Sequence, residues 1–214
     1  MDHHKPEIRA FFTALSKHLY KEAKTWRERQ GDSDWRKDTA RLATQYGLRP
    51  FANAEEVERM FSGDPSGRIL FIQPTRQQDN ILPFLNVTFT TNKDGNSKTR
   101  LVLGMLVKKG SASDHGFFGY RFESPEDSKN HNFHHIQPVT GIEKNDAMSN
   151  RCSVEWMPTR FPTFPTPAKD SIDLMLLSLL SFRGTSFIRS LSTVPALTTL
   201  KPAARIEELI GRIN

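Results

Sequence analysis

GFFGYRFE (residues 116–123), SPEDSKN (124–130) and HNFHHIQPV (131–139) follow one another in this chain, and together they decide the expected fold. In the first segment an aromatic side chain occupies every second position: Phe118, Tyr120 and Phe122. Strand side chains point alternately to the two faces of a sheet, so this alternation is typical of a strand with one buried face. The middle segment is polar and contains Ser124 and Pro125, as exposed turns do. The three segments therefore predict a β-hairpin.

The faces of this hairpin depend on its register. A simple antiparallel register makes three pairs: Glu123 with His131, Arg121 with Phe133, and Gly119 with His135. One face then carries five polar side chains: Arg121, Glu123, His131, His135 and Gln137. The other face places Tyr120 opposite His134. A slip of one residue would exchange the faces of the second strand and make Phe133 a core residue, so both registers remain open.

The segments before this hairpin also have the pattern of strands. Apolar or alternating stretches cover residues 68–73, 82–90 and 99–108, and residues 92–96 have the composition of a hairpin turn. A further edge strand is expected at residues 151–157. Consecutive strands joined by short turns predict an antiparallel meander of about five strands.

Helical patterns precede the predicted sheet. From Pro6 to Gly31 apolar residues recur at helical spacing, and the opposite side of this helix is basic. Two shorter helices are expected at residues 33–47 and 53–63, each with a capping residue at its start. These segments form a helical N-terminal unit.

The sequence after the sheet begins with a proline-rich strap. Prolines make residues 158–168 an extended segment rather than regular structure, and Phe161 and Phe164 are expected to hold it on the core. Residues 172–182 are apolar on nearly every side, which predicts a buried helix that ends at Arg183 and Gly184. A last amphipathic helix is expected at residues 202–213.

The predicted fold class is therefore α+β. It consists of an antiparallel β-meander of about five strands with an N-terminal helical unit and a buried C-terminal helix. A chain of 214 residues can form one domain of this kind. Its parts would be the helical unit at 1–62, the meander at 63–157, and the strap with the C-terminal helices at 158–214.

The composition bounds the function. A hydrophobic fraction of 36% and a charged fraction of 25% are those of an ordinary soluble protein. The net charge of +6 is spread along the chain, so it permits contact with nucleic acid without demanding it. Cys152 is the only cysteine, which excludes an internal disulfide and favours a cytoplasmic location. No signal peptide is expected, because no apolar run follows the charges at the N-terminus. No membrane contact is expected either, because the most apolar segment, residues 172–182, is too short to cross a bilayer.

The histidines raise the question of a metal site. In an extended strand, His131 and His135 would be about 13 Å apart, and His134 would point to the other face. Such a set cannot bind one ion, and the sequence has no HExxH or CxxC motif. We therefore expect neither a metal nor another cofactor.

The same polar face could instead be a metal-free acid–base site. Histidine titrates near neutral pH, and an arginine can hold a phosphate, so Arg121, His131 and His135 supply the groups that cleave a phosphodiester. Glu123 could orient an imidazole, and His115 could join from the start of the strand. The alternative interpretation is a solvated sheet face with cross-strand polar pairs.

Basic residues on the first helix form a second candidate site. They recur at helical spacing: Lys17, Lys21, Lys24 and Arg27. Such a face could contact the phosphates of a nucleic acid, and a solvated helix face would have the same composition.

Two functions follow from these features. The first is an intracellular binding or assembly subunit that acts with a protein partner or beside nucleic acid. The second is a metal-independent phosphodiesterase or ribonuclease, of the kind found in toxin or defence proteins, which uses the histidine-bearing sheet face. The sequence leaves open whether the protein is an enzyme.

Overall fold

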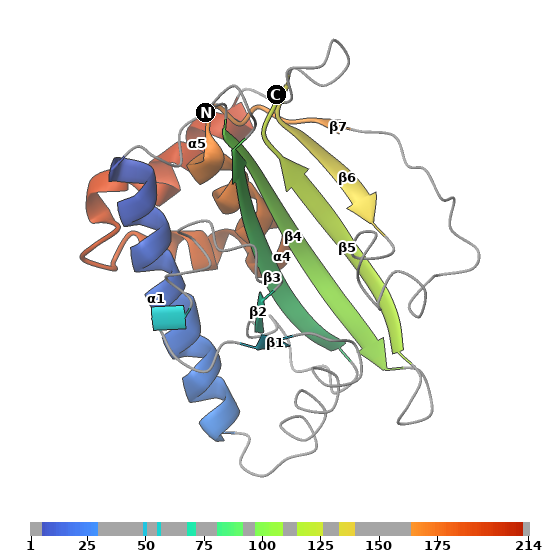
Figure 1. Ribbon diagram of the computed structural model, residues 1–214. Coiled ribbons are helices and arrows are strands. Elements are labelled where there is room, and N and C mark those ends of the chain that lie inside the picture. The colour runs from blue at the N-terminus through green and yellow to red at the C-terminus, as the bar shows by residue number, and fades with distance from the viewer. Residues whose placement is uncertain are drawn as a thin grey trace.

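The computed structural model describes residues 6–29, 49–50, 55–56, 68–71, 81–91, 97–108, 115–125, 133–139 and 164–211, although some side chains at the ends of these elements lie outside the description. In these residues helices cover one face of a long, twisted sheet (Figure 1). The helix α1 comes from the N-terminus, and α4 and α5 come from the C-terminus. The predicted α+β class is therefore confirmed.

Seven strands of the described chain form one sheet in sequence order. They are β1 (Arg49–Pro50), β2 (Arg68–Phe71), β3 (Ile81–Thr91), β4 (Ser97–Lys108), β5 (His115–Glu123), β6 (His135–Val139) and β7 (Phe164–Pro165). β1 pairs with β2 in parallel, and each later pair of neighbours is antiparallel. Strands β2 to β6 are the predicted antiparallel meander.

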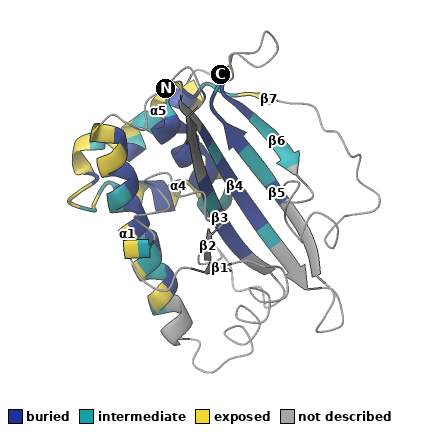
Figure 2. Cartoon of the chain, in the orientation of Figure 1, coloured by how far each residue is buried: buried dark blue, intermediate teal, exposed yellow. Residues whose placement is uncertain are grey.

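The hydrophobic core lies between this sheet and the helices. α1 (Pro6–Arg29) contributes a buried stripe at helical spacing: Ile8, Phe11, Phe12, Leu15, Leu19 and Ala23. The sheet contributes alternate residues of β3, β4 and β5: Leu85, Val87, Leu101, Leu103 and Phe122. Because strand side chains alternate, the residues between these ones lie on the opposite face, away from the helices. Figure 2 shows the buried inner side and the exposed outer side of α1.

The helix α4 (Ser171–Leu191) is a central element of the core. Every residue from Ser171 to Leu179 is buried, which confirms the predicted buried helix. Gly184 has φ 74° and ψ 177°, so the helix bends at the position where the sequence predicts its end. This backbone conformation is essentially restricted to glycine.

The helical conformation resumes after Gly184 and continues to Leu191, so α4 is 21 residues long rather than the shorter helix expected. By length and composition alone it could therefore cross a membrane. However, 61% of its most apolar window is buried inside the protein, and core helices of soluble proteins meet the same criterion. The length of α4 is thus weak evidence for a membrane span.

An ionic clasp joins the start of α4 to α5 (Pro202–Gly211). Asp170 caps α4 by accepting the backbone N–H of Asp173 at 2.9 Å. Arg205 Nη1 of α5 donates to Asp170 Oδ2 at 3.1 Å and to Asp173 Oδ1 at 2.8 Å. Burial raises the pKa of Asp173 despite this contact. Burial alone would lower the pKa of Arg205, but the two carboxylates outweigh it and the pKa is raised.

The expected hairpin register is wrong by four residues. Glu123 pairs with His135, Arg121 with Gln137, and Gly119 with Val139. Likewise, Pro138 lies opposite Tyr120, where His134 was expected. β6 begins only at His135, so the connection from β5 is longer than the predicted turn.

The proline-rich strap also departs from the expectation. Phe164 and Pro165 form the short strand β7, which pairs with Ile136 and His135 of β6. The side chain of Phe164 was expected on the core, but it is 52% exposed. Proline can join a sheet at such an edge, because an edge strand need not donate every backbone N–H.

Several expected elements fall on other parts of the chain. The helix at residues 33–47, the strand at 151–157 and the position of Phe161 lie outside the described residues. Of the helix expected at 53–63, only Glu55 and Glu56 are described, and both are helical. The last helix is confirmed as α5, preceded by the single 3₁₀ turn η1 (Thr198–Leu200).

Candidate functional site

A cluster of charged side chains lies on the face of the sheet away from the helices. It comprises Arg100 on β4, Arg121 and Glu123 on β5, and His135 and Gln137 on β6, and we call it the Glu123 cluster. Glu123 has Arg100 directly opposite it on one neighbouring strand and His135 directly opposite it on the other. Arg121 lies two residues earlier on β5, so its side chain shares this face.

Glu123 is the centre of the cluster. Its Oε1 accepts a hydrogen bond from Arg100 Nε at 2.7 Å, and its Oε2 forms an ion pair with Arg121 Nε at 2.9 Å. The same Oε2 lies 3.2 Å from His135 Nε2. Arg121 Nη2 also donates to Gln137 Oε1 at 2.6 Å. Glu123 and His135 are each only 2% exposed, whereas Arg100 and Arg121 retain 29% and 18% exposure.

His135 contacts the protein through both of its ring nitrogens. Its Nδ1 lies 3.1 Å from the carbonyl oxygen of Phe133, and its Nε2 faces the Glu123 carboxylate. A carbonyl oxygen and an ionised carboxylate accept hydrogen bonds, so each ring nitrogen faces an acceptor. Both ring nitrogens of this buried histidine are therefore engaged by groups of the protein itself.

The structure brings together three of the five residues proposed as catalytic: Arg121, Glu123 and His135. His131 lies outside the described residues. His115 begins β5, eight residues before Glu123, which places it about 26 Å along the strand. His115 therefore cannot join the Glu123 cluster.

His134 is a buried histidine next to the cluster. Burial lowers its pKa from 6.5 to about 4, so the ring is neutral near pH 7. Ala168 provides a backbone hydrogen bond, while the buried Nε2 has no hydrogen-bond partner in the described structure. The sequence placed His134 on the face opposite the polar residues, and its burial agrees with that placement.

Sequence reasoning missed Arg100. Residues 99–108 were interpreted as a strand that is apolar on both faces, and Arg100 was not considered for the site. A charged residue near the end of an apolar central strand was the available signal, because such a residue needs a partner on a neighbouring strand. Only the pairing of β4 with β5 shows that this partner is Glu123.

The second candidate site, the basic face of α1, is on the other side of the molecule. Lys17, Lys21 and Lys24 are exposed. Arg9, which lies about two helical turns before Lys17, is exposed as well. Successive helical residues are rotated by about 100°, so these cations lie opposite the buried apolar stripe. Arg27 lies in α1 beyond the part whose side chains are described.

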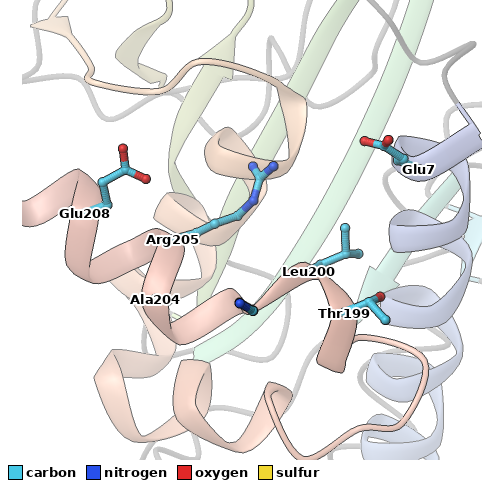
Figure 3. A pocket seen from close by; sticks show the side chains of 7 residues that line it. Glu7, Thr199, Leu200, Ala204, Arg205 and Glu208 are labelled. Carbon is cyan, nitrogen blue, oxygen red and sulfur yellow. The ribbon is translucent and has the colours of Figure 1, made fainter.

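Two further features bear on ligand binding. Among the described residues, no group of three or more His, Cys, Asp or Glu side chains could hold a metal ion. A hollow of about 580 Å³ lies where α1, η1 and α5 meet. Figure 3 shows Glu7 of α1 across this hollow from Arg205 and Glu208 of α5. Its lining mixes both signs of charge, and Arg205 already belongs to the clasp.

Comparison with known proteins provides no assignment of family. No protein-family model matches this chain, no curated protein matches it, and no solved structure matches it.

Proposed function

We propose that this protein is a non-enzymatic binding subunit that contacts nucleic acid through the basic face of α1. The observation that carries the proposal is the exposure of Arg9, Lys17, Lys21 and Lys24 on the side of α1 opposite its buried stripe. Lysine and arginine side chains on one helix face can contact successive phosphates and release their counterions. The net charge of +6 favours the same partner.

The state of His135 supports a binding role over a catalytic one. A general base needs an accessible lone pair within hydrogen-bond reach of its substrate. His135 is buried, and both of its nitrogens face acceptors within the protein. His134 is also buried. Neither described histidine of this hairpin therefore offers an acid–base group to a substrate at the surface.

The first test measures binding to a generic single-stranded RNA and a duplex DNA by fluorescence anisotropy. Replacing Lys17, Lys21 and Lys24 with Glu should weaken binding and reduce the slope of log affinity against log salt by about two to three. A matched control reverses three exposed cations on the C-terminal part of the chain: Lys169, Arg189 and Lys201. Equal losses in the two triple variants would contradict a specific role for α1.

The second test asks whether the protein is an enzyme. The parent protein is incubated with RNA and with a generic phosphodiester in the absence and presence of a chelator. We expect no turnover. Cleavage that disappears in His135→Ala, with the fold retained by circular dichroism, would overturn the proposal in favour of the metal-independent phosphodiesterase.

A further inference from the structure

His134 is a buried titratable group whose ring is not fully satisfied. The residue is only 5% exposed, and no described part of the protein forms a hydrogen bond with its buried Nε2 atom. A buried polar atom without a partner costs free energy. A protonated ring would cost more, because an imidazolium donates from both nitrogens and carries a charge. The site therefore accommodates a neutral ring better than a protonated one.

The described end of the proline-rich strap runs past His134. It comprises residues 164–168, which we call the cover, and it follows the edge of the described sheet beside β6 (Figure 1). Thr166 of the cover donates its backbone N–H to the carbonyl oxygen of His134 at 2.8 Å. Ala168 makes a backbone hydrogen bond with the His134 ring. The cover thus contacts both the backbone and the side chain of His134.

The cover is attached more weakly than its neighbours. β6 pairs with β5 at five positions, whereas the cover pairs with β6 as strand β7 at two. Pro165 and Pro167 have no backbone N–H that could extend this pairing. After the cover, the chain is fixed at Asp170, which caps α4 and belongs to the clasp with Arg205. A conflict at the His134 ring would therefore displace the cover before it displaces β6 or α4.

Burial has the largest effect on the His134 ring and lowers its pKa from 6.5 to about 4. Among the charged groups around it, Asp170 favours the protonated ring, whereas His135 and the amino terminus of the chain disfavour it. Asp170 also accepts from Arg205 Nη1 at 3.1 Å and from the backbone N–H of Asp173 at 2.9 Å. These contacts engage both of its oxygens, so the favourable effect of Asp170 does not offset the cost of burial. A ring that reached solvent would escape this cost.

We infer that residues 164–168 form a pH-sensitive cover, which separates from the edge of β6 when His134 takes up a proton. The protonated ring then turns into solvent, where water accepts a hydrogen bond from each nitrogen. Opening also uncovers the outer edge of β6, and an uncovered edge can pair with another strand. This inference goes beyond the proposed function and does not depend on the basic face of α1.

Hydrogen exchange at the backbone N–H of Thr166 measures the opening, because this N–H bonds to His134 in the closed state. Protection factors, which correct for the intrinsic pH dependence of exchange, are compared between about pH 7.5 and about pH 4.5. His134 titrates near 6.5 in the open state and near 4 in the closed state. The opening constant should therefore rise about tenfold per pH unit below pH 6.5, and about a hundredfold by pH 4.5.

Leu101 and Leu103 provide the reference for unfolding of the whole protein. They lie on β4, which is paired on both sides, so their N–H groups exchange only when the sheet opens. We expect these amides to remain more strongly protected than Thr166 at every pH. Such a difference shows that the cover opens while the sheet stays folded.

His134→Gln removes the titrating group and keeps a polar side chain. The loss of Thr166 protection by about pH 4.5 should shrink from about a hundredfold to less than about threefold. His18→Gln is the matched control, because it replaces a partly buried histidine on α1, and it should leave the loss unchanged. If His134→Gln does not fold, His134→Met takes its place, since an unbranched apolar side chain fills irregular sites.

Three results would overturn the inference. Thr166 protection that is constant over this pH range would show that protonation does not open the cover. Equal protection at Thr166, Leu101 and Leu103 at every pH would show that the cover opens only with the whole protein. An unchanged pH dependence in the His134 variant would assign the opening to another titrating group. Because the lysine variants of α1 leave the cover intact, none of these results bears on the proposed binding of nucleic acid.

Discussion

Replacing Gly184 with Ala tests the physical reason for the bend in α4. Gly184 has φ 74° and ψ 177°, a region that costs a residue with a Cβ about 1–3 kcal/mol. A Cβ built at this position would meet nothing within 4 Å, so no steric clash contributes to the cost. The substitution therefore isolates the backbone conformation.

The expected magnitude combines two opposing terms. Strain in the folded state destabilises the variant by about 1–3 kcal/mol. The lower conformational entropy of alanine in the unfolded chain returns about 0.4–1 kcal/mol. At the middle of the two ranges, Gly184→Ala should therefore lose about 1.3 kcal/mol, a measurable part of the about 5–15 kcal/mol that stabilises a typical domain.

Urea unfolding followed by circular dichroism measures this difference. Gly211→Ala is the matched control, because a Cβ there also meets nothing within 4 Å and Gly211 has no positive φ. Alanine is the better helix former, so Gly211→Ala should be neutral or slightly stabilising. If Gly184→Ala were as stable as the parent protein, the helix would not need a residue that tolerates positive φ at position 184, and our account of the bend would be refuted.

Three further predictions concern the core, the buried histidine and the clasp. Leu177→Asp should lower the free energy of unfolding in urea by several kcal/mol, because it buries an unpaired charge in α4. Thr185→Asp, at an exposed position of the same helix, should change stability by less than about 0.5 kcal/mol. Equal effects would place Leu177 outside the core. The pKa of His134 is about 4 in the folded protein, below its ordinary value of 6.5, so the unfolded chain binds more protons between pH 4 and pH 6.5. Stability should therefore fall by up to about 3 kcal/mol as the pH drops from 7 to 4. That slope should be smaller in His134→Gln, and an unchanged slope would assign it to other groups. Arg205→Gln should lose roughly 1–2 kcal/mol by removing the clasp, more than Lys169→Gln, which breaks only the exposed pair with Glu208.

The sequence by itself determined the main helices and strands and the alternation of faces along each strand. The apolar stripe of α1 and the buried run of α4 were evident from local patterns, whereas at Gly184 these patterns predicted the end of the helix rather than a bend. The sequence also placed Arg121, Glu123, His135 and Gln137 on one face, although the expected register was wrong. The reason is that the register is displaced by four residues, and an even displacement keeps every side chain on its face.

Tertiary structure alone decided which of these residues meet. Local patterns repeat along a strand, so they cannot choose between registers that differ by two or four residues. The pairing of β4 with β5 added Arg100 to the cluster, and the pairing of β5 with β6 made His135 rather than His131 the partner of Glu123. The same pairing buried His135 and engaged both of its nitrogens, which changes the chemistry expected of it. Burial and charge balance arise from contacts between distant segments, and no single segment of the sequence contains them.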